Sequence, residues 1–300
     1  MSLDLPASQL PPVYSPGRER LILFVLAVVQ FTAIVDFMIV MPLGPQLERE
    51  LGLTPTTFGH IVSSYTYAAA VAGLFASVLV DRFARRTAFL GIFTGFLAGT
   101  LACGLAPGYE WLLAARVFTG AFGGILGGIA LAIIGDVFPE SRRGWASGML
   151  MSAFAVASVA GVPLGIVLGQ RFGWHMPFFT LAALGVPVLL AAAASLPKLD
   201  RHLTKTHAHP FTTMRIIFAE PNHRRAFALT VALMFGGFTV IPFLSPYLVS
   251  NVGVAESDLP AVYIAGGALT LFGSPIAGKL ADRFGKLLVF RCISPLFAIT

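Results

Sequence analysis

Residues 21–43 read LILFVLAVVQFTAIVDFMIVMPL, and Asp36 is the one charged residue in this run. A helix of about 20 apolar residues crosses the roughly 30 Å hydrocarbon core of a bilayer. The segment therefore predicts a membrane-spanning helix that carries a carboxyl group at membrane depth.

The composition of the whole chain agrees with this first segment. Hydrophobic residues make up 56% of the 300 residues, charged residues only 11%, and the mean hydropathy is +0.82. A soluble domain carries about 25% charged residues. The excess of apolar side chains predicts a lipid environment. The two cysteines, Cys103 and Cys292, both lie in apolar runs, which argues against a disulfide scaffold and predicts no metal site.

Apolar runs of similar length recur along the chain, separated by short polar stretches. We expect an all-α membrane protein with spans at 21–43, 59–80, 87–106, 111–135, 145–169, 176–196, 226–250 and 260–278. A ninth run begins at 287 and continues to Thr300. Because a half-span is an unfavourable terminus in lipid, we expect the sequence to be cut from a longer one.

Lys and Arg residues predict the orientation of these spans. With the N-terminus inside, seventeen of the twenty Lys and Arg residues fall on the cytoplasmic side, Arg49 and Arg171 fall outside, and Arg116 lies within a span. This bias follows the positive-inside rule. It explains the net charge of +6 without a nucleic-acid partner. We expect a multi-pass protein of the inner cell membrane, with the lipid bilayer as its surroundings.

The spans divide the chain into four regions. We expect a cytoplasmic tail (1–20), a six-helix bundle (21–196), a cytoplasmic linker (197–225) and a partial second bundle (226–300). The linker contains four of the six histidines. This pattern is typical of a solvated connection, with a metal or pH sensor as the alternative.

The chain also repeats itself at an offset of 201 residues. Leu43, Pro45, Leu47 and Gly52 align with Leu244, Pro246, Leu248 and Gly253. Farther along, the pattern Leu-x-Asp-Arg-Phe that begins at Leu79 aligns with the one that begins at Leu280. Both matches occupy the same place in the predicted topology. The repeat predicts two copies of one helical unit, a common plan in secondary transporters.

The repeated loops carry a recognisable motif. Segment 278–286 reads GKLADRFGK and segment 77–86 reads SVLVDRFARR, in which Ser77 and Ala84 replace glycines of the first. Both resemble the cytoplasmic loop motif of the major facilitator superfamily. The resemblance covers the chain after residue 20 and implies two pseudo-symmetric six-helix halves, the second incomplete in this chain. It also implies that Asp81 pairs with the opposite half and holds the inner gate shut. The implied gating residues are Ser77, Asp81, Arg82, Arg85, Arg86, Gly278, Asp282, Arg283, Gly285 and Lys286.

Three further segments resemble the drug/proton antiporter branch of that superfamily. They are RVFTG at 116–120, GVPLG at 161–165 and QRFGW at 170–174, the last two in the form of the sugar- and purine-efflux subgroup. This resemblance implies proton-driven export of a small organic solute.

Two full charges lie well inside apolar spans, Asp36 and Arg116. Each costs roughly 2.5–3.5 kcal/mol at a helix centre, so a functional role or mutual pairing is expected. At 1.5 Å per residue, both lie about 22 Å from the inner face, so the side chains can meet. We hypothesise that Asp36 carries the coupling proton and Arg116 tunes it, because burial and a nearby guanidinium shift a carboxyl pKa in opposite directions. The alternative is a static pair that joins two helices.

Glycines and polar side chains complete the predicted machinery. Gly120, Gly124 and Gly128 place small residues on one helix face, which permits close packing. Gly161, Pro163 and Gly165 indicate a bend or a close contact. Polar positions in the first two spans are candidates for the substrate cavity, although each alone also fits a helix–helix hydrogen bond: Gln30, Thr32, Ser63, Ser64, Tyr65 and Tyr67.

The sequence thus favours a proton-coupled exporter that needs a proton gradient and no cofactor. We expect it to be a monomer. An uptake symporter or uniporter on the same fold is the alternative, and a nonfunctional truncated product stays open. The sequence argues against an intramembrane enzyme, because it has neither an H-E-x-x-H pattern nor a G-x-S-x-G elbow. Sugar, nucleoside and drug all remain open as the substrate.

Overall fold

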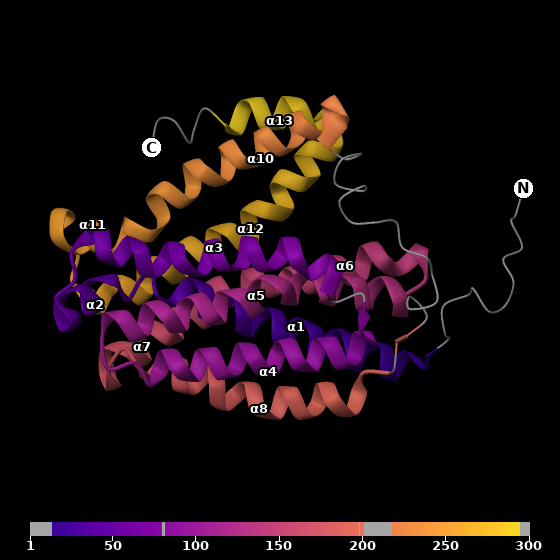
Figure 1. Ribbon diagram of the computed structural model, residues 1–300. Coiled ribbons are helices and arrows are strands. Elements are labelled where there is room, and N and C mark those ends of the chain that lie inside the picture. Colours follow the sequence, from indigo (N-terminus) through magenta and orange to yellow (C-terminus); the bar gives the residue numbers. More distant parts are fainter. Residues whose placement is uncertain (1–13, 80–81, 198, 201–217, 295–300) are drawn as a thin grey trace, which may run out of the picture.

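The structure is a computed structural model that describes residues 14–79, 82–197, 199–200 and 218–294 (Figure 1). Every regular element in these ranges is helical. The first part of the chain forms α1 (Pro16–Ile39), α2 (Gly44–Leu51), α3 (Pro55–Leu79), α4 (Arg85–Gly104), α5 (Tyr109–Val137), α6 (Glu140–Val156), a π-helical turn (Ala157–Gly161), α7 (Val162–Phe172) and α8 (Met176–Ser195).

The second part of the chain repeats the beginning of this order. It forms α10 (Pro221–Val240), a 3-10 turn (Ile241–Phe243), α11 (Leu244–Tyr247), a second π-helical turn (Leu248–Val252), a 3-10 turn (Glu256–Asp258), α12 (Leu259–Phe284) and α13 (Lys286–Ile293). Within the described residues, six helical segments are long and apolar enough to cross a membrane. They support the expected all-α membrane bundle.

The two ends of the bundle differ. We call the end where α1 and α4 begin the basic end. The opposite end, where α2 lies, is the α2 end. In Figure 1, α1 and α3–α8 run roughly alongside one another, whereas α10, α12 and α13 diverge from them away from the α2 end.

Buried side chains form two main clusters along the first bundle. One gathers around Phe89, Phe93 and Phe96 of α4, and the other lies near the α2 end around Phe58 and Trp174. Because lipid tails are as apolar as leucine, such helices associate by close packing more than by a hydrophobic driving force. Small residues at the contacts are therefore decisive.

Glycines on α5 allow α3 to approach closely. A Cβ atom added at Gly120 would collide with the backbone carbonyl oxygen of Tyr65, and one added at Gly124 would lie 2.6 Å from the Cα atom of Ala69. At Gly128 nothing lies within 4 Å. The expectation that all three glycines share the close contact is therefore wrong for Gly128, because α3 has separated from α5 by that level.

A second glycine series packs the fifth span against the first. Added Cβ atoms at Gly161, Gly165 and Gly169 would strike the side chains of Val35, Ile39 and Leu43, respectively. The glycines of the fifth span and the side chains that they contact are both spaced by four residues. One row of glycines therefore packs against one row of branched side chains. The close contact expected at Gly161 and Gly165 is present, and Gly169 extends it.

The fifth span also contains the irregularity that its sequence indicates. The π-helical turn Ala157–Gly161 lies between α6 and α7, and buried Pro163 stands at the start of α7. Proline has no N–H group to donate and its ring crowds the preceding turn. Here the π turn lies directly before the proline, so the helical hydrogen-bond pattern changes where the break occurs.

The backbone repeats as the sequence does. Gly52 ends α2 with φ +63°, and Gly253, its counterpart, ends the second π turn with φ +80°. Both adopt a left-handed conformation that side chains rarely tolerate. The duplication therefore extends to the local conformation of a turn.

Helix boundaries differ from the expected spans at polar ends. Helix α1 begins at Pro16, inside the expected tail, because Ser15 accepts a hydrogen bond from the Arg18 amide and caps it. Helix α10 begins at Pro221, inside the expected linker, and α2 is a polar helix that hydropathy does not detect. Residues 201–217, with most linker histidines, lie outside the described residues.

Gly120→Ala and Gly128→Ala form a matched pair on α5. We expect Gly120→Ala to lower the stability of the detergent-solubilised protein by about 1–3 kcal/mol, because the new methyl group overpacks against Tyr65. Gly128→Ala has room, so its stability should stay equal or rise slightly from helix propensity. Thermal unfolding measured by circular dichroism compares the two, and equal midpoints would contradict the α3–α5 contact.

Candidate functional site

A fully buried ion pair lies at the centre of the first bundle. Nη1 of Arg116 on α5 lies 2.8 Å from Oδ2 of Asp36 on α1, and neither side chain is more than 1% exposed. The same nitrogen donates to the backbone carbonyl oxygen of Asp36 at 3.2 Å. The structure therefore brings together the two charges whose depths the sequence had matched.

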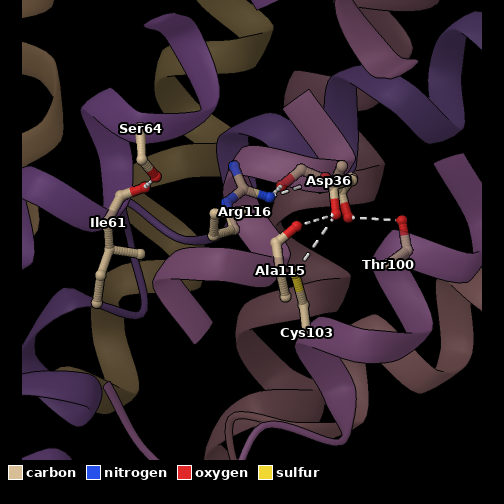
Figure 2. Close-up of polar contacts among 8 residues, drawn as sticks. Asp36, Ile61, Ser64, Thr100, Cys103, Ala115 and Arg116 are labelled. Atoms are coloured by element: carbon tan, nitrogen blue, oxygen red, sulfur yellow. Dashed lines mark hydrogen bonds and ion pairs between the residues drawn. The ribbon is translucent and has the colours of Figure 1, made fainter. Parts of the chain in front are cut away.

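Two more helices complete the surroundings of this pair. Thr100 on α4 donates its hydroxyl proton to Oδ1 of Asp36 at 3.0 Å (Figure 2). On the other side, the guanidinium carbon of Arg116 lies 4.3 Å from the ring centre of Tyr65 on α3. Such a cation–π contact is attractive, the more so when desolvated. Four helices therefore contribute to one polar cluster.

The position of Tyr65 follows from the glycine contact described above. Because Gly120 has no side chain, the Tyr65 backbone rests on α5 within one turn of Arg116. The Tyr65 hydroxyl lies against Gly123 on the same helix. Close packing thus fixes the ring over the guanidinium.

Thr119 and Cys103 border the pair on its α4 side. Both are fully buried, their side chains lie 3.6 Å apart, and Thr119 donates to the carbonyl oxygen of Ala115 at 2.7 Å. Arg116 Nε has no hydrogen-bond partner among the described residues. The cluster is therefore well packed, with one donor in reserve that a rearrangement can use.

This geometry suits a group that exchanges a proton while changing partners. A buried charge without a partner is strongly unfavourable, so Asp36 is stable as an anion only beside Arg116. If the helices separate, protonation of the carboxyl group removes the unpaired charge. The cluster can thus link helix position to protonation.

The polar candidates for the cavity separate into three kinds. Thr32, Ser63 and Ser64 donate to carbonyl oxygens of their own helices, those of Val28, His60 and Ile61. They are therefore satisfied locally rather than across helices. Tyr65 belongs to the ion-pair cluster, and Tyr67 is 72% exposed.

Gln30 differs from those residues. Its Oε1 atom is buried and has no hydrogen-bond partner among the described residues. A Cβ atom added at Gly127 would lie 3.5 Å from that oxygen. The side-chain amide oxygen of Gln30 therefore lies against the α5 backbone at Gly127, where it can accept a hydrogen bond.

Residues of the predicted first gating loop contact their own bundle. Arg85 Nε lies 3.4 Å from Oδ2 of Asp136, and Arg86 Nη2 donates to the carbonyl oxygen of Ala193 at 2.5 Å. Arg82 is exposed, Ser77 lies in α3, and Asp81 lies outside the described residues. The contacts of Arg85 and Arg86 thus hold α4 against α5 and α8.

The second gating loop joins α12 to α13. Gly278 and Asp282 lie in α12, and Lys286 begins α13. The guanidinium carbon of Arg283 lies 5.3 Å from the ring centre of Phe284. Gly285 has φ +92°, whereas Ala84, which corresponds to it, has φ −56°. The first loop therefore tolerates alanine because its backbone takes an ordinary conformation there.

Comparison with known proteins identifies the family. Residues 26–300 match the family described as the Major Facilitator Superfamily. This chain belongs to the major facilitator superfamily. The MFS-type transporter YtbD of Bacillus subtilis is 31% identical over 264 residues, which cover 87% of this chain and 65% of YtbD. The inner membrane transport protein YdhP of Escherichia coli K12 is 26% identical over 245 residues, which cover 81% and 62% of the two chains.

A solved structure shows the same fold. The bacterial homolog of the human lysosomal transporter Spinster, in its inward-facing and unoccupied conformation, superposes with a TM-score of 0.74 at 22% identity. The match covers 91% of this chain and 64% of that one. This facilitator chain therefore spans slightly less than two thirds of the length of the relatives it matches and is a multi-pass membrane protein.

Some site residues of this facilitator were missed by the sequence. Thr100 and Cys103 lie in an apolar run with nothing to separate them from packing residues. Tyr65 was proposed for a cavity, but its ring covers Arg116. Only the lateral arrangement of helices reveals these contacts.

The buried pair makes a testable prediction about stability. Arg116→Met leaves an unpaired carboxylate, so we expect a loss of about 3–5 kcal/mol in the free energy of unfolding. Asp36→Asn together with Arg116→Met removes both charges and should recover most of that loss. Unfolding of detergent-solubilised variants measures both, and a double variant no more stable than Arg116→Met would contradict the pairing.

Proposed function

We propose that this protein is a proton-coupled secondary transporter that exports a small organic solute by alternating access. The buried Asp36–Arg116 pair carries the proposal. Two charges in an apolar bundle are costly, and such residues commonly serve proton relays and ion pathways in transporters. Asp36 would carry the coupling proton, and Arg116 would replace that proton when the carboxylate is ionised.

The pair is suited to coupling because it spans helices that can move. Asp36 lies on α1, which packs on the glycine stripe of α7, next to the π turn. Arg116 lies on α5. A small rearrangement at the π turn would change the distance between the two charged groups, and with it the preference for a proton.

The orientation of the protein follows from its arginines. The positive-inside rule assigns the basic end to the cytoplasm, and with it the N-terminus. Helices α10, α12 and α13 diverge from the first bundle away from the α2 end (Figure 1). We therefore interpret this conformation as inward-facing, with the α2 end closed toward the outside, in the inner cell membrane.

Two features of the first bundle bear on the solute. The side-chain amide oxygen of Gln30 is buried and has no hydrogen-bond partner among the described residues. Aromatic rings lie beside the ion pair, since the Tyr65 ring covers Arg116 and its centre lies 5.2 Å from that of Phe37. An acceptor and aromatic rings within one bundle suit a flat or cyclic solute with a donor group, as a drug, a nucleoside or a sugar has. The energy source would be the proton gradient, with no cofactor.

Transport in proteoliposomes tests the function. Antiport predicts that candidate drugs, purines or pentoses accumulate when the lumen is acidic, whereas symport predicts accumulation when the outside is acidic. A uniporter would respond to neither. We expect Asp36→Asn to abolish gradient-driven accumulation, while Glu19→Gln, a buried carboxylate paired with Arg142 at 2.8 Å, should retain it. Accumulation undiminished in Asp36→Asn would refute the role of Asp36.

The gating role of Asp81 is a separate proposal, based on the loop motif. If Asp81 stabilises closure of the inner gate against the opposite half, Asp81→Ala should slow transport without reducing membrane insertion. Initial transport rates normalised to the amount of inserted protein measure this effect. Unchanged rates would exclude a gating role for this carboxylate.

A further inference from the structure

We propose that Arg49 and Glu256 form an outer latch, which holds the two halves together at the α2 end and must open before the protein faces outward. Nη1 of Arg49 lies 2.5 Å from Oε1 of Glu256, and Nη2 lies 3.3 Å from Oε2. The guanidinium thus engages both carboxylate oxygens, the strongest geometry for such a pair. The residues are 207 positions apart and belong to different halves.

The Arg49 side of the latch is anchored to the first half. Gln46 on α2 is buried and donates to the carbonyl oxygen of Gly169 on α7 at 3.2 Å. It also donates to Glu50, one turn further along α2, at 2.7 Å. Helix α2 is therefore held to the first bundle, so Arg49 moves with that bundle.

A third contact between the halves holds the backbone of Glu256. Gln170 on α7 donates from Nε2 to the backbone carbonyl oxygen of Glu256 at 2.5 Å. Glu256 begins the short 3-10 turn that leads directly into α12. The first half thus holds both the backbone and the side chain of one residue, at the point where the second half begins its long helix.

Apolar contacts surround the latch and close the same end. The rings of Phe58 and Phe243 meet edge to face with their centres 6.1 Å apart. A Cβ atom added at Gly44 would lie 3.0 Å from Pro246. Near the opposite end, the ion pairs of Arg85 with Asp136 and of Arg142 with Glu19 each join elements of the first half alone.

The ion pair of the latch is weak enough to open and close. The side chains are 60% and 30% exposed, so solvent screens the pair and limits its contribution. Glu256 raises the pKa of Arg49 above its usual range by a hydrogen bond and by its charge. Arg49 therefore stays charged, and opening depends on separation of the halves rather than on titration of the arginine.

Spin labels at the α2 end test the latch directly. Thr56→Cys on α3 and Asn251→Cys on the second π turn, in a Cys292→Ser background, place one label on each half of the full protein in nanodiscs. Pulsed dipolar spectroscopy then reports the distances between labels. We expect Arg49→Glu to shift the ratio of closed to open populations toward open by about two- to five-fold, as for an exposed ion pair.

The charge swap and a neighbour serve as controls. Arg49→Glu combined with Glu256→Arg should restore the closed population, because the opposite charges again face each other. Arg171→Glu makes the same charge change on the last turn of α7 and should leave the distances unchanged. Distances insensitive to Arg49→Glu, or a swap no more closed than the single variant, would overturn the latch.

Salt gives an independent readout. Between 0.1 M and 1 M salt the screening length falls from about 10 Å to 3 Å. High salt should therefore increase the open population of the unmodified protein and should not change that of Arg49→Gln. An equal response in both proteins would contradict the latch. The inference rests on the proposed alternating access, but the label distances need no solute, so failure of transport and failure of the latch are distinguishable.

Discussion

The ion pair between Asp36 and Arg116 constrains the first bundle more than any apolar contact, because at membrane depth neither charge can turn to water. Each residue must be matched by a helix that places its partner within hydrogen-bonding distance, here 2.8 Å. While the pair is intact, helices α1, α3, α4 and α5 are therefore held around one point. Any motion that separates the pair must supply a replacement charge or a proton, which is why we connect the pair with coupling.

Glycines provide the closeness that this pairing requires. Gly120 brings α3 onto α5 and thereby sets Tyr65 over Arg116, and Gly161 and Gly165 seat α1 on the fifth span beside the π turn. The same series thus joins packing to the polar cluster. At the α2 end, a different balance holds, since an exposed ion pair and a few apolar contacts join the halves with modest strength. A closely packed bundle with a weak closure is a reasonable construction for alternating access.

The sequence predicted what depends on distance along one helix. Spans follow from apolar length, and the meeting of Asp36 with Arg116 followed from the rise per residue in two helices of opposite direction. It did not predict what depends on lateral position: Thr100 beneath the carboxylate, or Gly169 as an extension of the glycine stripe. Contacts such as that of Arg49 with Glu256 leave no local signal in the sequence. The failure at Gly128 has the same cause, because spacing on one helix does not reveal where its neighbour departs.

Whether the Asp36 carboxyl group changes its protonation state during turnover is the most direct test of this account. Infrared difference spectroscopy of the protein labelled at aspartate carbons, recorded between alkaline and acidic conditions and with Asp36→Asn as reference, reports the carbonyl stretch of a protonated carboxyl group. The account predicts a band that grows on acidification within the pH range of transport and is missing in Asp36→Asn. A protein that transports its solute with this band unchanged across the whole range would show that the pair is a static tie between helices.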